Sequence, residues 1–160
     1  MKLGILSDTH GQTLRTRCAI ALLQQHGAEA FIHCGDVGDL DVLDELAGHR
    51  CWFVWGNTDV PRPAWREHLA NLDLPWPDGP LELTLAGKRI AVFHGHEHGF
   101  DTAMIRAEHD YLLHGHSHQA DDYRRDNMRV INPGALHRTH RKTVALLDLA
   151  TDEVTHIEVA

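Results

Sequence analysis

The sequence predicts an α/β protein with a β-α-β-α-β first half and a hairpin-rich second half. In the first half, short apolar runs alternate with segments of helical character, which is typical of strands joined by crossover helices. In the second half, turn residues such as Gly87-Lys88 separate neighbouring apolar runs, as in hairpins. Five apolar runs also end on residues that can bind metal ions, and open α/β sheets hold their ligands at strand ends.

The first half is expected to form three strands and two helices. In order, these are a strand over Lys2–Leu6, a helix over Thr13–His26, a strand leading to Asp36, a helix over Leu40–Ala47 and a strand over Cys51–Trp55. Gly27 supplies a stop for the first helix. The apolar side of that helix is assigned to Leu14, Cys18, Leu22 and Leu23. We expect right-handed crossovers between the strands.

The second half begins with a long connection and continues mainly as hairpins. Residues Asp59–Pro80 hold five of the six prolines, so we expect a loop that packs over a sheet edge and contains one short helix at Trp65–Ala70. The other predicted elements are a helix over Asp101–His109 and strands over Leu81–Ala86, Arg89–Phe93, Tyr111–His114, Asp121–Arg125, Met128–Ile131, Thr143–Leu149 and Glu153–Val159.

Length, charge and cysteine content restrict the class of protein. A chain of 160 residues is about one domain, so we expect a single domain over residues 1–160. The net charge of -8 argues against nucleic acid as a stable partner. No apolar run is long enough for a membrane span and the first run is too short for a signal peptide, so we expect a cytoplasmic protein without a membrane partner. The three cysteines have no short-spaced pair and are expected to be buried thiols.

The residues at the strand ends predict a metal centre organised around Asp36. The other candidates in this position are Asp8, His10, Asn57, His94, His116 and His118. Because residues two apart in an extended segment point the same way, Asp8 with His10, and His116 with His118, are expected to face one cavity. Two ions roughly 3.5 to 4 Å apart would clamp the oxygens of a phosphoryl displacement and supply hydroxide at neutral pH. Such a cationic pocket in an acidic protein favours an anionic, phosphate-type substrate.

These segments resemble the motifs of the calcineurin-like metallophosphoesterases. The similar segments are Asp8-Thr9-His10, Gly35-Asp36, Gly56-Asn57-Thr58-Asp59, His94-Gly95-His96 and Gly115-His116-Ser117-His118. With Asn132-Pro133-Gly134 included, the chain is most similar to the small single-domain phosphodiesterase branch. The resemblance implies a two-sheet α/β sandwich. It also implies a hydrolase, a metal-dependent phosphodiesterase that uses a metal-bound hydroxide on a small phosphate ester.

The same resemblance implies two divalent metal ions that share Asp36. One ion would take Asp8, His10, Asp36 and His118, and the other would take Asp36, Asn57, His94 and His116. Asn57 would also contact the substrate and take part in catalysis, although Gly-Asn is a turn signal as well. Carboxylate, amide oxygen and imidazole ligands without a thiolate suit manganese, our first choice, or iron, zinc, cobalt or nickel.

One position departs from the family. Many members carry a histidine after the asparagine of the third motif, and that histidine is taken to be the general acid. This chain has Thr58, whose hydroxyl is too weak an acid for that role. His96 is the candidate replacement, with a hydrogen bond that orients a ligand as its equal alternative. Arg138, in a basic run with Arg141 and Lys142, is either a solvated residue or a contact for the substrate's second phosphate substituent.

The remaining histidines and two other function classes complete the interpretation. His33 and His114 are assigned to hydrogen bonds in the core, and His98 is left open. Solvated or capping roles are assigned to His26, His49, His68, His109, His137, His140 and His156. A protein-interaction scaffold similar to the retromer scaffold subunit is the alternative function, and a homo-oligomer remains open. A phosphoacceptor domain built on Asp8 and Asp36 would leave the four histidine ligands unexplained.

Overall fold

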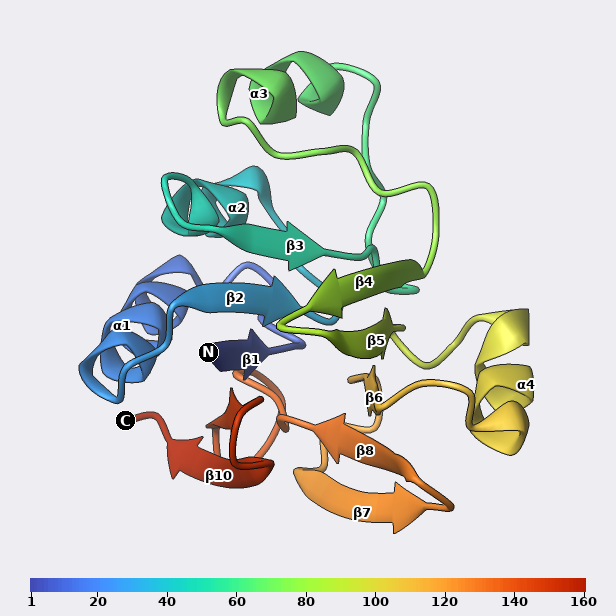
Figure 1. The fold of residues 1–160 in the computed structure, drawn as a ribbon. Coiled ribbons are helices and arrows are strands. Elements are labelled where there is room, and N and C mark those ends of the chain that lie inside the picture. Colours follow the sequence, from blue (N-terminus) through green and yellow to red (C-terminus); the bar gives the residue numbers. More distant parts are fainter.

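Two five-stranded sheets packed face to face form the centre of the protein. The structure is a computed structural model that describes all of residues 1–160. The first sheet has the strand order β10-β9-β1-β2-β3, and the second has the order β4-β5-β6-β8-β7. Helices α1 and α2 lie on the outer side of the first sheet and α4 lies on that of the second (Figure 1). The predicted two-sheet α/β sandwich is confirmed.

The first sheet combines a parallel half with an antiparallel hairpin. Its parallel strands are β1 (Lys2–Leu6), β2 (Ala30–His33) and β3 (Cys51–Phe53), joined through α1 (Thr13–Gln25) and α2 (Leu40–Leu46). The hairpin of β9 (Thr143–Asp148) and β10 (Glu153–Glu158) adds to the free edge of β1. Leu6 pairs with His33, and His33 pairs with Phe53. The carboxyl ends of the three parallel strands are therefore level, and the loops that follow them lie side by side.

The second sheet contains more parallel pairing than the sequence suggested. Its strands are β4 (Leu81–Leu85), β5 (Lys88–Val92), β6 (Tyr111–Leu113), β7 (Asp121–Arg125) and β8 (Met128–Asn132). The predicted hairpins β4–β5 and β7–β8 are confirmed. However, β5, β6 and β8 are parallel, and α4 (His98–Arg106) connects β5 to β6. The prediction that hairpins replace crossovers after β4 was therefore incomplete. Val92, Leu113 and Ile131 are in register, so these strand ends are level too.

Three apolar clusters hold the layers together. The cluster between the sheets includes Ile5 and Ile32 from the first sheet and Val92, Leu113 and Ile131 from the second. A second cluster lies between the first sheet and helices α1, α2 and α3 (Trp65–Asn71), and a third lies under α4. The inner strands β1, β2 and β6 are almost entirely buried, as their apolar runs predict, whereas the edge strand β7 is exposed along its whole length. The longest helix, α1, has 13 residues, and none of the helices could span a bilayer.

The buried face of α1 agrees with the prediction in part, since Leu23 is buried and Leu22 packs against the core. Leu14 is 73% exposed and Cys18 is also exposed, so neither belongs to the core face. The buried residues of this helix are Thr16, Ala19, Ile20 and Leu23. Their spacing is that of one helical face, and Thr16 is tolerated there because its hydroxyl donates a hydrogen bond to the Gln12 carbonyl over 2.9 Å. The prediction therefore missed Thr16, Ala19 and Ile20.

Two element boundaries and one cysteine assignment are also corrected. The β4–β5 turn consists of Ala86 and Gly87, with φ of 49° and 76°, and not of Gly87-Lys88. Positive φ at both positions matches the type I′ turn that suits the strand twist. Helix α4 begins at His98 and stops before Ala107, whose φ of 48° is left-handed. All three cysteines are free, but of these only Cys34 is fully buried.

Candidate metal centre

The loops at the level strand ends bring the seven predicted ligand residues together. Asp8 and His10 follow β1, Asp36 follows β2 and Asn57 follows β3. His94 follows β5, and His116 and His118 follow β6. The first sheet thus contributes four of these residues and the second contributes three. The candidate centre spans the interface between the sheets.

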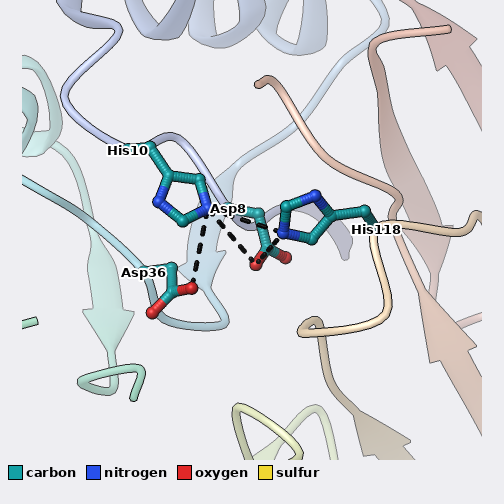
Figure 2. Close-up of side chains that lie close together, drawn as sticks. All are labelled: Asp8, His10, Asp36 and His118. Carbon is teal, nitrogen blue, oxygen red and sulfur yellow. Dashed lines mark hydrogen bonds and ion pairs between the residues drawn. The ribbon is translucent and has the colours of Figure 1, made fainter. Parts of the chain in front are cut away.

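Four of these residues form the first cluster, shown in Figure 2. One potential ligand atom from each of Asp8, His10, Asp36 and His118 lies within 4.8 Å of all the others. His118 Nε2 is 3.2 Å from Asp8 Oδ1, and His10 Nε2 is 3.6 Å from Asp36 Oδ2. The two imidazole Nε2 atoms are 3.5 Å apart. This arrangement of two carboxylates and two imidazoles could hold one divalent cation.

A second cluster forms on the other side of Asp36. His94 Nε2 and His116 Nδ1 are each 3.0 Å from Asn57 Oδ1. His94 Nε2 is also 3.4 Å from Asp36 Oδ2, the same oxygen that faces His10 in the first cluster. Asp36 is 3% exposed, whereas Asn57 and His116 are exposed. The Asp36 carboxylate therefore lies between the two clusters, and one side of the second cluster is open to solvent.

The hydrogen bonding of Asp8 and His94 fits bound metal ions. Asp8 Oδ2 accepts hydrogen bonds from the Ser7 hydroxyl over 2.6 Å and from the His116 N–H over 3.1 Å. The buried Oδ1 has no hydrogen-bond partner and faces only the imidazoles of the first cluster, with His118 Nε2 at 3.2 Å. A buried carboxylate oxygen without a partner is costly unless a cation neutralises it. His94 Nδ1 faces the Cys34 carbonyl at 2.7 Å, so Nδ1 donates and Nε2 is left to bind a cation.

The pKa shifts reflect the same concentration of charge. Burial lowers the pKa of His94, but the Asp36 carboxylate and the Cys34 carbonyl outweigh burial and raise this pKa. Burial raises the pKa of Asp36, yet hydrogen bonds from His94 and Thr58 hold it well below its ordinary value. The pKa of His10 is lowered, mainly by burial. Asp36 is thus an anion at neutral pH, and a proton would compete with any cation for His94.

Most of the clustered residues have a left-handed backbone. Five residues have positive φ: Asp8 at 53°, His10 at 44°, Asp36 at 54°, His116 at 70° and His118 at 60°. Residues other than glycine rarely adopt this conformation, and each such case costs about 1 to 3 kcal/mol. Asp8 and His10 converge as predicted, but the predicted cause, an extended segment, was wrong. The side chains converge because tight left-handed turns direct them to one point.

Two carboxylates that the sequence analysis did not single out fix the ligand loops. Asp59 accepts hydrogen bonds from the N–H groups of Gly56, Val37 and Gly38 over 2.7, 3.1 and 2.9 Å, which ties the loop after β3 to the loop after β2. Glu97 accepts from the N–H groups of His94 and Gly95, both over 2.7 Å. Asp59 was visible only as the last residue of the Gly56-Asn57-Thr58-Asp59 segment, and Glu97 carried no signal in the sequence.

Two glycines leave room for the carboxylates. A Cβ atom at Gly56 would overlap the Asp36 carboxylate, and one at Gly115 would overlap the Ser7 hydroxyl and the Asp8 carboxylate. Both glycines are buried beside the clusters. A larger residue at either position would displace a clustered carboxylate. The absence of a side chain at these two positions therefore allows the carboxylates to occupy the clusters.

The other predicted site residues lie at the edges of the clusters. The ring centroid of His96 is 5.4 Å from that of His94 and 6.4 Å from that of His116, and its side chain is 36% exposed. His96 Nδ1 is 3.7 Å from Glu97 Oε2. Arg138 is exposed and lies near enough to His10 to lower the pKa of that imidazole slightly. His96 and Arg138 thus border opposite clusters.

The structure also places the remaining histidines. His33 Nε2 is 2.9 Å from the Thr9 hydroxyl, and Nδ1 of the same ring accepts the Gly35 N–H over 3.1 Å, so its predicted core role is confirmed. His114 is likewise hydrogen-bonded, to the Gly115 carbonyl at 3.1 Å. His156 was assigned to a loop or helix end, but it lies within β10 with Nε2 2.8 Å from the Asn132 carbonyl.

Comparisons with known proteins agree with this geometry. A model of the calcineurin-like phosphoesterase superfamily domain matches residues 1–152. A phosphodiesterase of Methanocaldococcus jannaschii is 29% identical over 98% of both chains. Phosphodiesterase YfcE of Escherichia coli is 27% identical over 85% of this chain and 79% of its own length.

Solved structures extend the comparison to the fold. The structure of an archaeal phosphodiesterase matches with a TM-score of 0.87 and 28% identity, covering 99% of this chain and 100% of that one. Vps29 of Entamoeba histolytica, in a zinc complex, matches with a TM-score of 0.68 and 17% identity, covering 99% of this chain and 91% of its own. At that identity the likeness to Vps29 concerns the fold alone.

Proposed function

Since the chain belongs to the calcineurin-like phosphoesterase superfamily, we propose that it is a phosphodiesterase that works with two divalent metal ions. The position of Asp36 Oδ2, 3.6 Å from His10 Nε2 and 3.4 Å from His94 Nε2, is the observation that carries this proposal. One carboxylate oxygen that faces two ligand clusters is suited to bridge two ions. The names of the curated relatives point to phosphodiesters as the substrate class.

The proposed ligand sets follow the two clusters. The first ion would be held by Asp8, His10, Asp36 and His118, and the second by Asp36, Asn57, His94 and His116. All ligand atoms are carboxylate oxygen, amide oxygen or imidazole nitrogen, and Cys34 is buried outside both sets. Such ligands suit manganese, which is our proposal for the working metal, and also iron, zinc, cobalt or nickel.

The protein groups around the clusters would bind and orient the phosphate. When bound, two divalent cations lower the pKa of water to supply the nucleophile and neutralise charge on the phosphate oxygens. Asn57 Oδ1 faces the imidazoles of His94 and His116, so its amide N–H₂ is left to donate a hydrogen bond to a phosphate oxygen on the exposed side. We assign to His96 the transfer of a proton to the departing oxygen, a role that its position beside His94 supports. To Arg138, near His10, we assign the attraction of an anionic substituent.

A metal-binding scaffold is the second candidate. The likeness to Vps29 in its zinc complex favours it, because that protein shares the fold. Two observations favour the enzyme. All seven candidate ligand positions carry side chains that can bind metal, and Asn57 and His116 are exposed where a substrate would arrive. The two candidates differ in one measurable property, because only the enzyme would hydrolyse a phosphodiester.

The test is metal-dependent hydrolysis of bis(4-nitrophenyl) phosphate. Chelator-treated protein should be inactive, and addition of manganese should restore turnover. His116→Ala should reduce kcat at least about 100-fold, since even residues that only support metal ligands are worth 10- to 100-fold. His26→Ala, an exposed histidine at the end of α1, is the matched control and should retain the parent rate. Inactivity of the parent with all five metals, or full activity of His116→Ala, would refute the proposal.

A further inference from the structure

A hollow of about 360 Å³ adjoins the second cluster. Its walls include Trp55, Gly56, Trp76, Asp78, His96 and Glu97. Gly56 directly precedes Asn57, and the His96 ring centroid is 5.4 Å from that of His94. One imidazole ring, that of His96, therefore separates the hollow from the candidate ligand His94. Its volume is within the range of pockets that bind small molecules.

Aromatic rings form a fixed wall of this hollow. The ring centroids of Trp55 and Trp76 are 5.4 Å apart in an edge-to-face arrangement, and Trp55 also packs edge-to-face on Phe53 at 5.0 Å. The guanidinium of Arg66 lies 4.2 Å from the centroid of the Trp76 ring. The indole N–H of Trp55 is buried without a hydrogen-bond partner, although buried indole N–H groups usually have one. The wall thus offers preformed flat surfaces.

Two of the three ionisable side chains that line the hollow are carboxylates, Asp78 and Glu97, and the third is His96. Glu97 is engaged by two backbone N–H groups, whereas the Asp78 carboxylate is exposed at the rim. The hollow contains no lysine or arginine, so it disfavours an anionic substituent. A carboxylate beside aromatic rings instead suits a neutral flat ring that carries N–H donors. Nucleobases have this chemistry, since they stack on aromatic side chains and their exocyclic amino groups donate to carboxylates.

We infer that this hollow binds the nucleobase of a nucleoside phosphodiester while the phosphate occupies the metal centre. The substrate class presupposes the phosphodiesterase activity proposed above. Trp76 and Trp55 supply the stacking surface, and Asp78 accepts from an exocyclic amino group. The phosphate is thereby presented to Asn57, which is adjacent in sequence to the Gly56 wall. These residues select the substituent and do not touch the bond that breaks.

The kinetic test uses two diesters with the same 4-nitrophenyl leaving group. One carries adenosine through its 5′-oxygen and the other carries a methyl group, so only the second substituent differs. The parent should have a higher kcat/KM for the adenosine ester. Trp76→Ala should reduce the ratio of the two kcat/KM values at least about 5-fold, because stacking on an aromatic side chain contributes about 1 to 3 kcal/mol per base.

Trp65→Ala is the matched control for lost packing. Trp65 belongs to the same aromatic group, 6.1 Å from Trp55, but it does not line the hollow. This variant should keep the parent ratio. A parent with no preference for adenosine, or equal ratios in parent and Trp76→Ala, would overturn the inference.

A binding measurement separates the subsite from the activity. Adenosine, which has no phosphate, should shift the indole N–H NMR signals of Trp55 and Trp76 but not that of Trp52, with signals assigned by single Trp→Phe variants. Trp52 lies outside the hollow. If the methyl ester is hydrolysed and adenosine shifts neither signal, the subsite is wrong and the phosphodiesterase proposal stands. If adenosine shifts both signals and no diester is hydrolysed with any metal, nucleoside binding is supported and the phosphodiesterase proposal fails.

Discussion

Replacement of Asp59 tests whether this carboxylate holds the two ligand loops together. Its Oδ2 accepts the N–H groups of Gly56 and Val37, which are buried, and its Oδ1 accepts that of the exposed Gly38. In Asp59→Ala the Gly38 N–H can bond to water, but two buried N–H groups lose their partner. At about 1.5 kcal/mol for each buried group left unsatisfied, the expected loss in free energy of unfolding is about 3 kcal/mol.

The conservative variant Asp59→Asn makes the test specific. An amide oxygen in the place of Oδ2 can still accept from Gly56 and Val37, so only the charge and the Gly38 bond are lost. We expect a loss of about 1 kcal/mol for this variant. For a chain of this length, the alanine variant should unfold about 6 to 12 °C below the parent. Asp101→Ala, an exposed carboxylate on α4, is the control and should stay within about 0.5 kcal/mol.

Thermal and urea unfolding in chelator, followed by manganese titration, provide the measurements. Both Asp59 variants should bind manganese more weakly, and alanine should have the larger effect, about 10- to 100-fold, because the loops of Asp36 and Asn57 lose their connection. An alanine variant within 1 kcal/mol of the parent would refute the reasoning. Equal destabilisation by alanine and asparagine would show that charge, and not the pair of buried N–H groups, is the important factor.

Three further expectations concern Asp36, His96 and the cysteines. Asp36→Asn should lose close to two equivalents of bound metal, measured by elemental analysis, and retention of one tight ion would contradict bridging. His96→Ala should slow esters of basic alcohols about 10²- to 10⁴-fold while nitrophenyl esters are nearly unaffected, and an equal loss on both would indicate a supporting role only. Iodoacetamide at pH 8 should modify exposed Cys18 in the native protein. Cys34 and Cys51 should react only in denaturant, because burial raises their pKa, that of Cys51 to about 11, and peptide mapping would show any exception.

Local sequence signals predicted much of the fold. Apolar runs closed by turn residues indicated strands such as Lys2–Leu6 and Asp121–Arg125, whose observed bounds are the same. The parallel pairing of β6 with β8 was missed because it depends on packing between distant segments. The buried face of α1 was assigned only in part, because Leu23 is buried as predicted but Leu14 is exposed and Ile20 was missed.

The candidate site was predictable in its residue types but not in its backbone or supporting contacts. Asp36 and its neighbours could be found because metal-binding side chains recur after strands. The left-handed φ of Asp8 and His116 could not be predicted. Aspartate and histidine adopt this region only in a minority of cases, so their presence in a sequence does not indicate it. Asp59 and Glu97 could not be distinguished from solvated carboxylates. Their role is to accept hydrogen bonds from backbone N–H groups, and only the folded chain brings those groups to them.

The division of the clusters between the two sheets couples metal binding to folding. Asp8 of the first sheet faces His118 of the second at 3.2 Å, and Asp36 faces His94 at 3.4 Å. A cation bound to such pairs binds only the state in which the sheets are packed together. By mass action, a free metal concentration of 100 times Kd would add about 2.7 kcal/mol to the free energy of unfolding. Each bound ion thus acts as a crosslink between the sheets, and the free energy of unfolding depends on the concentration of free metal.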